Sequence, residues 1–424
     1  MSILIKDGRV INPAEKRDEI TDILVSDDKV VAVGNDICED ADQIIDATGC
    51  FVMPGLIDLH VHLRDPGLTY KEDIESGGNA AVNGGYTTVC CMPNTKPVVD
   101  NEEVIKYIVE TAKAKSPANV LPVGSVTKGM LGNEITDVFA MKEAGICAIS
   151  EDGKSVMNSE VYREAMINSV KADIPVLAHC EDINLVHGGV INMGDKSEEF
   201  GVNGISNAVE DIIVARDILL AKETGAKLHL CHCSTKDSVT MVQQAKADGI
   251  KVTAEVCPHH FAMSTDDMKS ADSNYKMNPP LRTREDVDAL IKGLSEDIMD
   301  VIATDHAPHS AEEKARPITQ APFGIVGSET AVPLTVTYLL QPGHISPMQM
   351  AEKMSYNPAQ VLGIDKGDIS VGKIADIVII DPEKEYNIDV NAFKSKGRNT
   401  PFDGLKVKGS VEYTIVAGRI VKGK

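Results

Sequence analysis

The sequence predicts an α/β protein: a (β/α)8 TIM-like barrel with a small β-rich domain built from both chain termini. Between residue 55 and about residue 365, short apolar runs alternate with helical stretches, which is typical of βα units and a parallel sheet. Eight such runs can be counted, and eight βα units close naturally into a barrel. A doubly wound open sheet is the alternative, but no Gly-x-Gly-x-x-Gly pattern follows the first run. The 424 residues suit a large barrel with an accessory domain.

The predicted barrel strands are short and mostly apolar. They span Leu56–His62, Thr87–Asn94, Val120–Val126, Cys147–Asp152, Pro175–Cys180, Lys227–Cys233, Val252–Pro258 and Val301–Pro308. Between them, one helix is expected over Asn101–Lys115 with Asp100 as its N-cap. Another is expected over Asn207–Glu223, where apolar residues recur at helical spacing.

The two ends of the chain are rich in short strands and turns. Asp7-Gly8 and Asp27-Asp28 each interrupt an apolar run and predict hairpins, and Ala375–Asp381 and Gly409–Val421 read as further strands. Neither end is long enough to form a good core alone. We therefore expect residues 1–54 and 366–424 to form one composite β domain, with the catalytic barrel, residues 55–365, inserted between them.

Composition and charge exclude several classes of protein. A net charge of −22 argues against a general nucleic-acid-binding surface and against attraction to anionic membranes. No apolar window is long enough to cross a bilayer, and the first residues lack a signal-peptide pattern. The nine cysteines are scattered through apolar segments, which indicates reduced thiols in a cytoplasmic protein.

Two histidines separated by one residue end the first predicted strand. His60 and His62 lie in the run Gly55–Gly67 (GLIDLHVHLRDPG). Side chains at positions i and i+2 of an extended strand share a face, so both imidazoles can reach one metal ion. A buried strand that happens to carry two histidines is the alternative, and the rest of the chain must decide between them.

Reactive side chains gather at the ends of the predicted strands, where barrel enzymes have their chemistry. In chain order they are His60, His62, Asn94, Asp152, His179, His232, Asp305 and His309. Imidazoles together with carboxylates suit zinc or a related divalent ion. Four histidines and two carboxylates exceed what one open catalytic zinc needs. They suit two ions about 3.5–4 Å apart with one carboxylate bridging, a pair that activates a water and polarises a carbonyl.

Neighbouring cysteines and histidines are assigned supporting roles. Cys231 and Cys233 flank His232, and strand alternation predicts that both point away from it. His259 and His260 follow the seventh strand, and the metal site is complete without them. We therefore expect His259 and His260 to be structural or to orient the ligands.

Three further features suit a small anionic substrate. Arg64 follows His62 by two residues and can place a guanidinium beside the metals, suited to a carboxylate; a surface ion pair with Asp65 is the alternative. Asn278 lies in a proline-rich loop and can bind an amide edge. The glycines of residues 322–327 let the backbone approach a ligand closely.

Six stretches spread along nearly the whole chain match one family in order. They are Asp58–Gly67 (DLHVHLRDPG), Met92–Pro97 (MPNTKP), Glu151–Gly153 (EDG), Met277–Arg282 (MNPPLR), Ala303–His309 (ATDHAPH) and Pro322–Thr330 (PFGIVGSET). On these stretches the chain resembles the amidohydrolase superfamily, and within it the bacterial and archaeal class I dihydroorotases. Two departures are Glu151, where many relatives have Asp, and the segment Asp182–Ser206, which is only loosely similar.

The resemblance implies a role for each site residue. One zinc ion would be held by His60, His62 and Asp305, the other by His179 and His232, with Asp152 bridging the two. Asp305 would also be the general acid/base. The substrate-binding residues implied are His62, Leu63, Arg64, Asn94, Asn278, His309, Phe323 and Gly324. Arg64, Asn94 and His309 would bind the substrate carboxylate, and Asn278 with the backbone of residues 323–324 would hold the pyrimidine ring.

The implied activity is the reversible cyclisation of N-carbamoyl-L-aspartate to (S)-dihydroorotate with loss of water, the third step of de novo pyrimidine (UMP) biosynthesis. Two Zn²⁺ ions per subunit are expected. In the hydrolytic direction, Asp305 would move a proton from the attacking water to the departing ring nitrogen. A homodimer and an association with aspartate carbamoyltransferase are further expectations.

Two alternatives remain open from the sequence. Hydantoinases and allantoinases share the fold and the histidines but use a carbamylated lysine on the fourth strand. Here that strand has no lysine, and Lys154 lies beyond its end. The second alternative is a non-catalytic relative that partners aspartate carbamoyltransferase, which is disfavoured because all six ligands are present.

Overall fold

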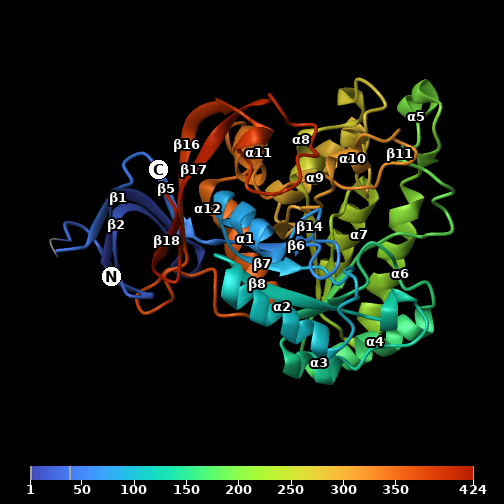
Figure 1. Cartoon of the computed structure of the whole chain (residues 1–424), viewed down its shortest axis with the longest axis horizontal. Helices are drawn as coiled ribbons and strands as arrows, with labels where there is room; N and C mark the ends of the chain where they lie inside the picture. The colour runs from blue at the N-terminus through green and yellow to red at the C-terminus, as the bar shows by residue number, and fades with distance from the viewer. Residues whose placement is uncertain (1, 38–39, 424) are drawn as a thin grey trace.

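The computed structural model describes residues 2–37 and 40–423 of the chain. A β-rich part, built from the first and last strands, lies beside a barrel built from the middle of the chain (Figure 1). In the figure the blue and red ends of the chain meet on the left, and the barrel with its helices fills the right.

The β-rich part is one sheet to which both ends of the chain contribute. Its strands are β1 (Ser2–Asn12), β2 (Arg17–Ser26), β3 (Lys29–Gly34), β4 (Gln43–Asp46), β5 (Phe51–Pro54), β16 (Ile377–Asn387), β17 (Lys406–Val416) and β18 (Arg419–Lys422). They follow the order β18-β17-β16-β5-β1-β2-β3, and β4 pairs with β1. The ends join where β16 runs antiparallel to β5. The β-rich terminal domain is confirmed, while its limits at residues 54 and 366 stay a prediction.

One of the two predicted hairpins is wrong. Asp7-Gly8 lies inside the continuous strand β1, where the pairing with β2 shifts register between Ile5 and Gly8. Asp7 has φ 57°, and its N–H donates to Asp22 Oδ1 over 3.0 Å. This left-handed residue forms a β-bulge, and the chain does not reverse direction there. Asp27-Asp28 does form the tight turn, between the paired residues Ser26 and Lys29.

The barrel consists of eight parallel strands in sequential order, as predicted. They are β6 (Leu56–Val61), β7 (Tyr86–Cys91), β8 (Asn119–Ser125), β9 (Ala148–Ser150), β10 (Val176–Ala178), β13 (Leu228–Leu230), β14 (Val252–Val256) and β15 (Val301–Ile302). The circle is nearly closed. A parallel bridge pairs Val61 with His306, and the His62 N–H donates to the His306 carbonyl over 2.8 Å.

Helices cover the outside of the barrel. Those between and after the strands are α1 (Ile74–Asn83), α2 (Glu102–Lys115), α3 (Val138–Ala144), α4 (Ser159–Ala172), α6 (Ala208–Thr224), α7 (Lys236–Ala247), α9 (Arg284–Ser295), α11 (Ala331–Thr335), α12 (Pro347–Ala351) and α13 (Asn357–Leu362). Short helices α8 (Pro258–Ala262) and α10 (Ala311–Lys314) lie in the loops. The segment 182–206 projects outward and carries β11 (Ile191–Asn192), α5 (Asp195–Phe200) and β12 (Gly204–Ile205).

The predicted helix cap at Asp100 is wrong by one residue. Asn101 caps α2, because its side chain accepts hydrogen bonds from the N–H groups of Glu103 and Val104. Asp100 accepts the N–H of Gly129 over 2.8 Å instead and ties two loops together. Asn and Asp are about equally good caps, so the sequence alone does not separate them.

A buried aspartate closes the wall below the barrel mouth. Asp58 accepts hydrogen bonds from the Thr304 hydroxyl at 2.6 Å, the Thr304 N–H at 3.1 Å and the His60 N–H at 3.1 Å. These bonds join the end of β6 to the segment after β15. Burial raises the pKa of Asp58 to about 6, although the bonds from Thr304 and His60 counteract it.

The strands stop earlier than the sequence predicts. β13 ends at Leu230 and β15 at Ile302, whereas Cys233 and Pro308 were expected. His232 and Asp305 adopt left-handed φ values of 35° and 48°, which extended strands do not contain. The chemistry-bearing residues therefore begin the loops that follow the strands.

Among the described residues, no helix is long and apolar enough to cross a membrane.

Candidate active site

A cavity of about 190 Å³ opens at the carboxyl ends of the barrel strands. Its lining consists of His62, Arg64, Asn94, Asp152, Gly153, His179, His232, Asn278, Asp305, Ala307, His309, Phe323 and Gly324. Nearly all residues singled out in the sequence therefore meet at one place. His60 lies just beneath and is fully buried.

Four imidazoles surround the carboxylate of Asp152. Its Oδ1 atom lies 3.1 Å from His60 Nε2, 3.3 Å from His179 Nδ1 and 3.5 Å from His232 Nε2, and its Oδ2 atom lies 3.4 Å from His62 Nε2. The two oxygens thus face different histidines, as a bridging carboxylate requires.

Asp305 completes the cluster on the side of the first strand. Its Oδ1 atom lies 3.2 Å from His62 Nε2 and 3.6 Å from His60 Nε2. Ligand atoms of these three residues all lie within 4.8 Å of one another, and the same is true of His60, Asp152 and His232. The two groups share His60 and so lie side by side.

The charges of the cluster favour a cation. Burial alone would lower the pKa of His60, but the Asp152 carboxylate raises it well above its usual value. Burial also opposes protonation of His179, yet hydrogen bonds to Asp152 and Glu181 raise its pKa to about 10. These rings favour positive charge, which a divalent ion supplies in place of protons.

Unmet hydrogen-bonding capacity points the same way. His60 Nε2 and Asp152 Oδ1 are buried and lie 3.1 Å apart, yet neither atom forms a hydrogen bond of good geometry with any described residue. His179 Nδ1 faces His232 Nε2 at 2.9 Å, an arrangement in which neutral rings can share only one proton. Imidazole nitrogens and carboxylate oxygens converging on one space suit zinc or a similar ion, so the donors fit metal ligation.

Two glutamates that the sequence analysis missed hold the histidines in place. Glu255 accepts from His60 Nδ1 at 3.0 Å and from the backbone N–H of His232 at 3.1 Å. Glu181 lies 3.2 Å from His179 Nε2 and accepts from Asn278 Nδ2 at 2.9 Å. Carboxylates that bind the second nitrogen of a ligand histidine fix its orientation. A charged residue inside the apolar strand Val252–Val256 was the available signal for Glu255.

A positive wall lies opposite the histidine cluster. Arg64 is buried, and its Nε donates to the carbonyl of Pro308 over 3.3 Å. Lys71 Nζ donates to His309 Nδ1 over 3.2 Å, so His309 Nε2 carries the proton that it donates to the Phe323 carbonyl over 2.8 Å. Burial and the nearby Arg64 guanidinium lower the pKa of His309 to about 2, so this ring stays neutral.

Of the other predicted substrate-binding residues, Asn94 lines the cavity and Leu63 does not. Asn94 Oδ1 lies 3.0 Å from His62 Nδ1, and its Nδ2 donates to the Asp152 carbonyl over 3.3 Å. Leu63 is outside the lining, because its side chain is buried in the main hydrophobic core near Gly77 of α1. Any contact of Leu63 with a ligand would come from its backbone.

One prediction about the cysteines is wrong. Cys231 does not turn away from the cluster; its sulfur lies within 4.8 Å of ligand atoms of His60 and Glu255. The strand ends at Leu230 and His232 is left-handed, so regular alternation no longer applies. Cys233 does lie in the core on the helix side.

Lys154, the lysine beyond the end of the fourth barrel strand, is engaged outside the histidine cluster. Its Nζ donates to the Met130 carbonyl over 3.2 Å.

Two buried lysines and an asparagine shape the far wall of the cavity. Lys276 Nζ donates to the carbonyls of Ile318 and Ala321 over 2.7 and 2.6 Å, and lies 4.4 Å from the centre of the Phe323 ring. Lys314 Nζ donates to the carbonyl of Gly324 over 3.0 Å.

Asn399, from the segment leading to β17, acts on the same wall. It donates to the Gly324 carbonyl over 3.0 Å and accepts the His309 N–H over 3.1 Å. No motif in the sequence signalled these supports.

Family comparisons agree with the geometry. A family model described as Dihydro-orotase-like matches residues 49–238, and a model of the Amidohydrolase family matches residues 219–422. The barrel and its histidine-aspartate mouth therefore define an amidohydrolase, a class of metal-dependent hydrolases.

Full-length relatives narrow the class. Dihydroorotase from Acetivibrio thermocellus is 48% identical over 99% of this chain and 98% of that protein. Dihydroorotase from Ruminiclostridium cellulolyticum is 46% identical over 100% of this chain and 99% of that protein. The chain belongs to the dihydroorotase family.

Solved structures with the same fold are more distant in sequence. The L-hydantoinase (dihydropyrimidinase) from Arthrobacter aurescens superposes with a TM-score of 0.89 at 27% identity, over 100% of this chain and 96% of that one. The dihydropyrimidinase from Brevibacillus agri gives 0.87 at 25% identity, over 100% and 95%. The whole architecture, including the β-rich part, is thus shared with cyclic amide hydrolases.

The lysine support gives a first prediction. Lys314→Met keeps most of the length of the side chain but removes the donor of the Pro322 carbonyl and leaves the Gly324 carbonyl with Asn399 alone, which loosens the backbone at Phe323. We expect KM for the cyclic substrate to rise by about tenfold with a smaller change in kcat, as one net hydrogen bond of roughly 1–1.5 kcal/mol is lost. Steady-state kinetics, with the exposed Lys292→Met as control, test this.

The same variant has a pH signature. Burial lowers the pKa of Lys314 to about 7, with the nearby Lys276 acting in the same direction. The unfolded chain therefore binds the extra proton between about pH 7 and 10, and the unfolding free energy gains up to about 1.4 kcal/mol per pH unit from this lysine. Urea titrations should show that the unfolding free energy of the wild type, relative to that of Lys314→Met, increases from about pH 7 to about pH 10. A constant difference would contradict the assignment.

Proposed function

We propose that this chain catalyses the reversible cyclisation of N-carbamoyl-L-aspartate to (S)-dihydroorotate, and that it does so with two zinc ions. The choice of substrate rests on the environment of Arg64. It is buried at the cavity wall, and among the described residues no carboxylate pairs with it. A buried guanidinium without an anion is unfavourable, and the substrate carboxylate supplies that anion.

The proposed metal ligands divide between the two sides of Asp152. His60, His62 and Asp305 would hold one ion, His179 and His232 would hold the other, and Asp152 would serve both. When bound, the ions supply a water of lowered pKa and polarise the scissile carbonyl. The orphaned nitrogen of His60 and orphaned oxygen of Asp152 support this arrangement.

The side chains of the cavity bind and orient the ring. Arg64, Asn94 and His309 engage the carboxylate at the positive wall. Asn278 and the backbone of residues 323–324 hold the amide edges. Lys314 and Asn399, which bind the Gly324 carbonyl, keep that backbone in place. Since this wall faces the Asp152 cluster, the ring amide lies between them.

Asp305 moves the proton. In ring opening, its carboxylate takes a proton from the attacking water and gives it to the ring nitrogen as the C–N bond breaks. In ring closure, Asp305 removes the proton of the ureido nitrogen, which attacks the carbon of the protonated carboxyl group; Asp305 then returns the proton to the departing oxygen, which leaves as water. The position of Asp305 3.2 Å from His62, on the cavity lining, supports this role.

Hydantoinase or allantoinase activity is the competing proposal, since the hydantoinases share the fold. Those substrates lack the carboxylate that Arg64 would bind. Purified, zinc-loaded protein should open dihydroorotate and show little turnover of hydantoin or allantoin, and chelation should abolish the reaction. Preferential turnover of either neutral ring would overturn the proposal.

Asp305→Asn tests the proton transfer. The amide keeps the size of the side chain but cannot accept the proton, so we expect kcat to fall by a factor of about 10²–10⁴. Circular dichroism should remain unchanged. Glu312→Gln, an exposed change on α10, is the control. Near-normal turnover by Asp305→Asn would remove Asp305 from this role.

Arg64→Met tests the carboxylate site. Loss of charge-assisted hydrogen bonds of about 1.5–3 kcal/mol should lower kcat/KM for dihydroorotate by roughly 10- to 100-fold. Any turnover of dihydrouracil, the same ring without a carboxylate, should change little. Arg284→Met, on the half-exposed surface of α9, is the matched control. Equal losses on both substrates would assign Arg64 a purely structural role.

Assembly and location remain proposals. We propose a homodimer and an association with aspartate carbamoyltransferase, both measurable by light scattering of the separate and mixed proteins. We also propose a cytoplasmic location, which is supported by the free thiols of Cys90, Cys91, Cys147 and the four described cysteines that follow them in the chain.

A further inference from the structure

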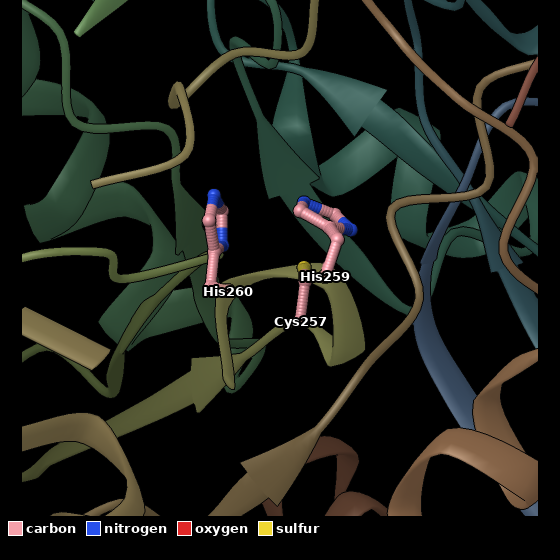
Figure 2. A group of neighbouring side chains, drawn as sticks. All are labelled: Cys257, His259 and His260. Carbon is pink, nitrogen blue, oxygen red and sulfur yellow. The ribbon is translucent and has the colours of Figure 1, made fainter. Parts of the chain in front are cut away.

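A second group of metal-binding side chains lies beside the proposed active site. Cys257, His259 and His260 follow β14 within four residues, and Cys257 is the N-cap of the short helix α8. All three are at most 2% exposed, and their ligand atoms lie within 4.8 Å of one another. Figure 2 shows the three side chains projecting from the same side of the turn.

Hydrogen bonding fixes the tautomer of His260. Its Nε2 lies 3.0 Å from the carbonyl oxygen of Pro279, which can only accept, so Nε2 carries the proton. A proton on Nδ1 as well would leave a buried cation whose second N–H has no acceptor, so the ring is neutral. Nδ1 therefore presents a bare lone pair, and it has no hydrogen-bond partner among the described residues.

His259 adds a second nitrogen that no described residue engages. Its Nε2 is buried and also lacks a hydrogen-bond partner within the described part of the chain. The two rings lie close, with centroids 4.2 Å apart and planes at 60°. Each buried polar atom without a partner costs about 1–3 kcal/mol. Two such nitrogens beside a thiol therefore need an explanation that packing does not provide.

A metal ion would bind both unpartnered nitrogens and the thiol of Cys257 at once. A histidine ligand commonly donates its other ring N–H to a backbone carbonyl, as His260 does to Pro279. One thiolate with two imidazoles is a borderline-soft donor set that suits zinc or cobalt and leaves a fourth position for water.

We propose that Cys257 Sγ, His259 Nε2 and His260 Nδ1 form a third metal site, distinct from the cluster around Asp152. Binding replaces the thiol proton of Cys257, which is released to solvent as the sulfur–metal bond forms. None of these three residues is a ligand in the proposed catalytic pair. The site goes beyond the proposed function and stands without it.

The position of the site suggests what it stabilises. Through His260 it holds the carbonyl of Pro279, and the adjacent Asn278 lines the active-site cavity. An ion at this turn therefore fixes the loop that carries Asn278 relative to the end of β14. Loss of the ion should raise KM more than it lowers kcat.

Metal content and spectroscopy test the proposal directly. The full chain, loaded with Co²⁺ and freed of excess metal, should hold one more ion per chain than Cys257→Ala. It should also show thiolate-to-cobalt absorption in the near ultraviolet, which Cys257→Ala loses and Cys233→Ala, a matched buried thiol, retains. Equal metal content in wild type and Cys257→Ala would overturn the proposal. Absorption that survives in Cys257→Ala but disappears in Cys231→Ala would also overturn it, because the thiolate ligand would then be Cys231.

A measurement on the wild type tests the proposal even if Cys257→Ala fails to fold. X-ray absorption at the zinc edge of the zinc-loaded wild type should show a sulfur scatterer at about 2.3 Å, which imidazole and carboxylate ligands cannot produce. A shell of nitrogen and oxygen alone would overturn the proposal. His260→Gln, which lacks the Nδ1 donor, should weaken the sulfur contribution.

Discussion

The carboxylate of Asp152 lies 3.1–3.5 Å from nitrogens of four imidazoles, and this crowding governs how the rest of the molecule is built. The rings lie at the carboxyl ends of three different strands, β6, β10 and β13, which only a nearly closed barrel brings to one point. Without a metal ion, protonated rings must balance the carboxylates, as the raised pKa values of His60 and His179 indicate. The glutamates 181 and 255 hold the rings from behind, so the cluster is preorganised for positive charge.

Backbone strain accompanies this arrangement. Arg64, His232 and Asp305 are non-glycine residues with φ of 59°, 35° and 48°, conformations that cost about 1–3 kcal/mol each. Each turns the chain sharply where a strand has ended and directs a side chain into the cavity. Supports outside the mouth hold these turns: the His232 N–H donates to Glu255, and Asn399 binds the wall that faces Arg64. The C-terminal segment that leads to β17 is therefore part of the site as well as of the β-rich sheet.

The sequence predicted the barrel, its eight strands and nearly all the lining residues, because short apolar runs that alternate with helical stretches, and reactive residues at the ends of those runs, are local signals. It could not place the strand ends, since left-handed residues such as His232 are set by tertiary contacts. For the same reason it misjudged Cys231, and it read the bulge at Asp7 as a hairpin. Glu255 and Lys314 were missed because their roles depend on partners far away in the sequence. Leu63 was chosen by resemblance, and its side chain lies in the core.

Anomalous diffraction at the zinc edge, from crystals of the protein purified without chelator, tests the central claim most directly. The account predicts two peaks within the Asp152 cluster, one on each side of the Asp152 carboxylate, apart from the third peak expected at Cys257, His259 and His260. One peak of the pair should lie among His60, His62 and Asp305, and the other beside His179 and His232. A single peak, or none, within this cluster in a crystal whose four imidazoles keep this arrangement would contradict it. The cluster would then be a hydrogen-bonded network that needs no pair of ions.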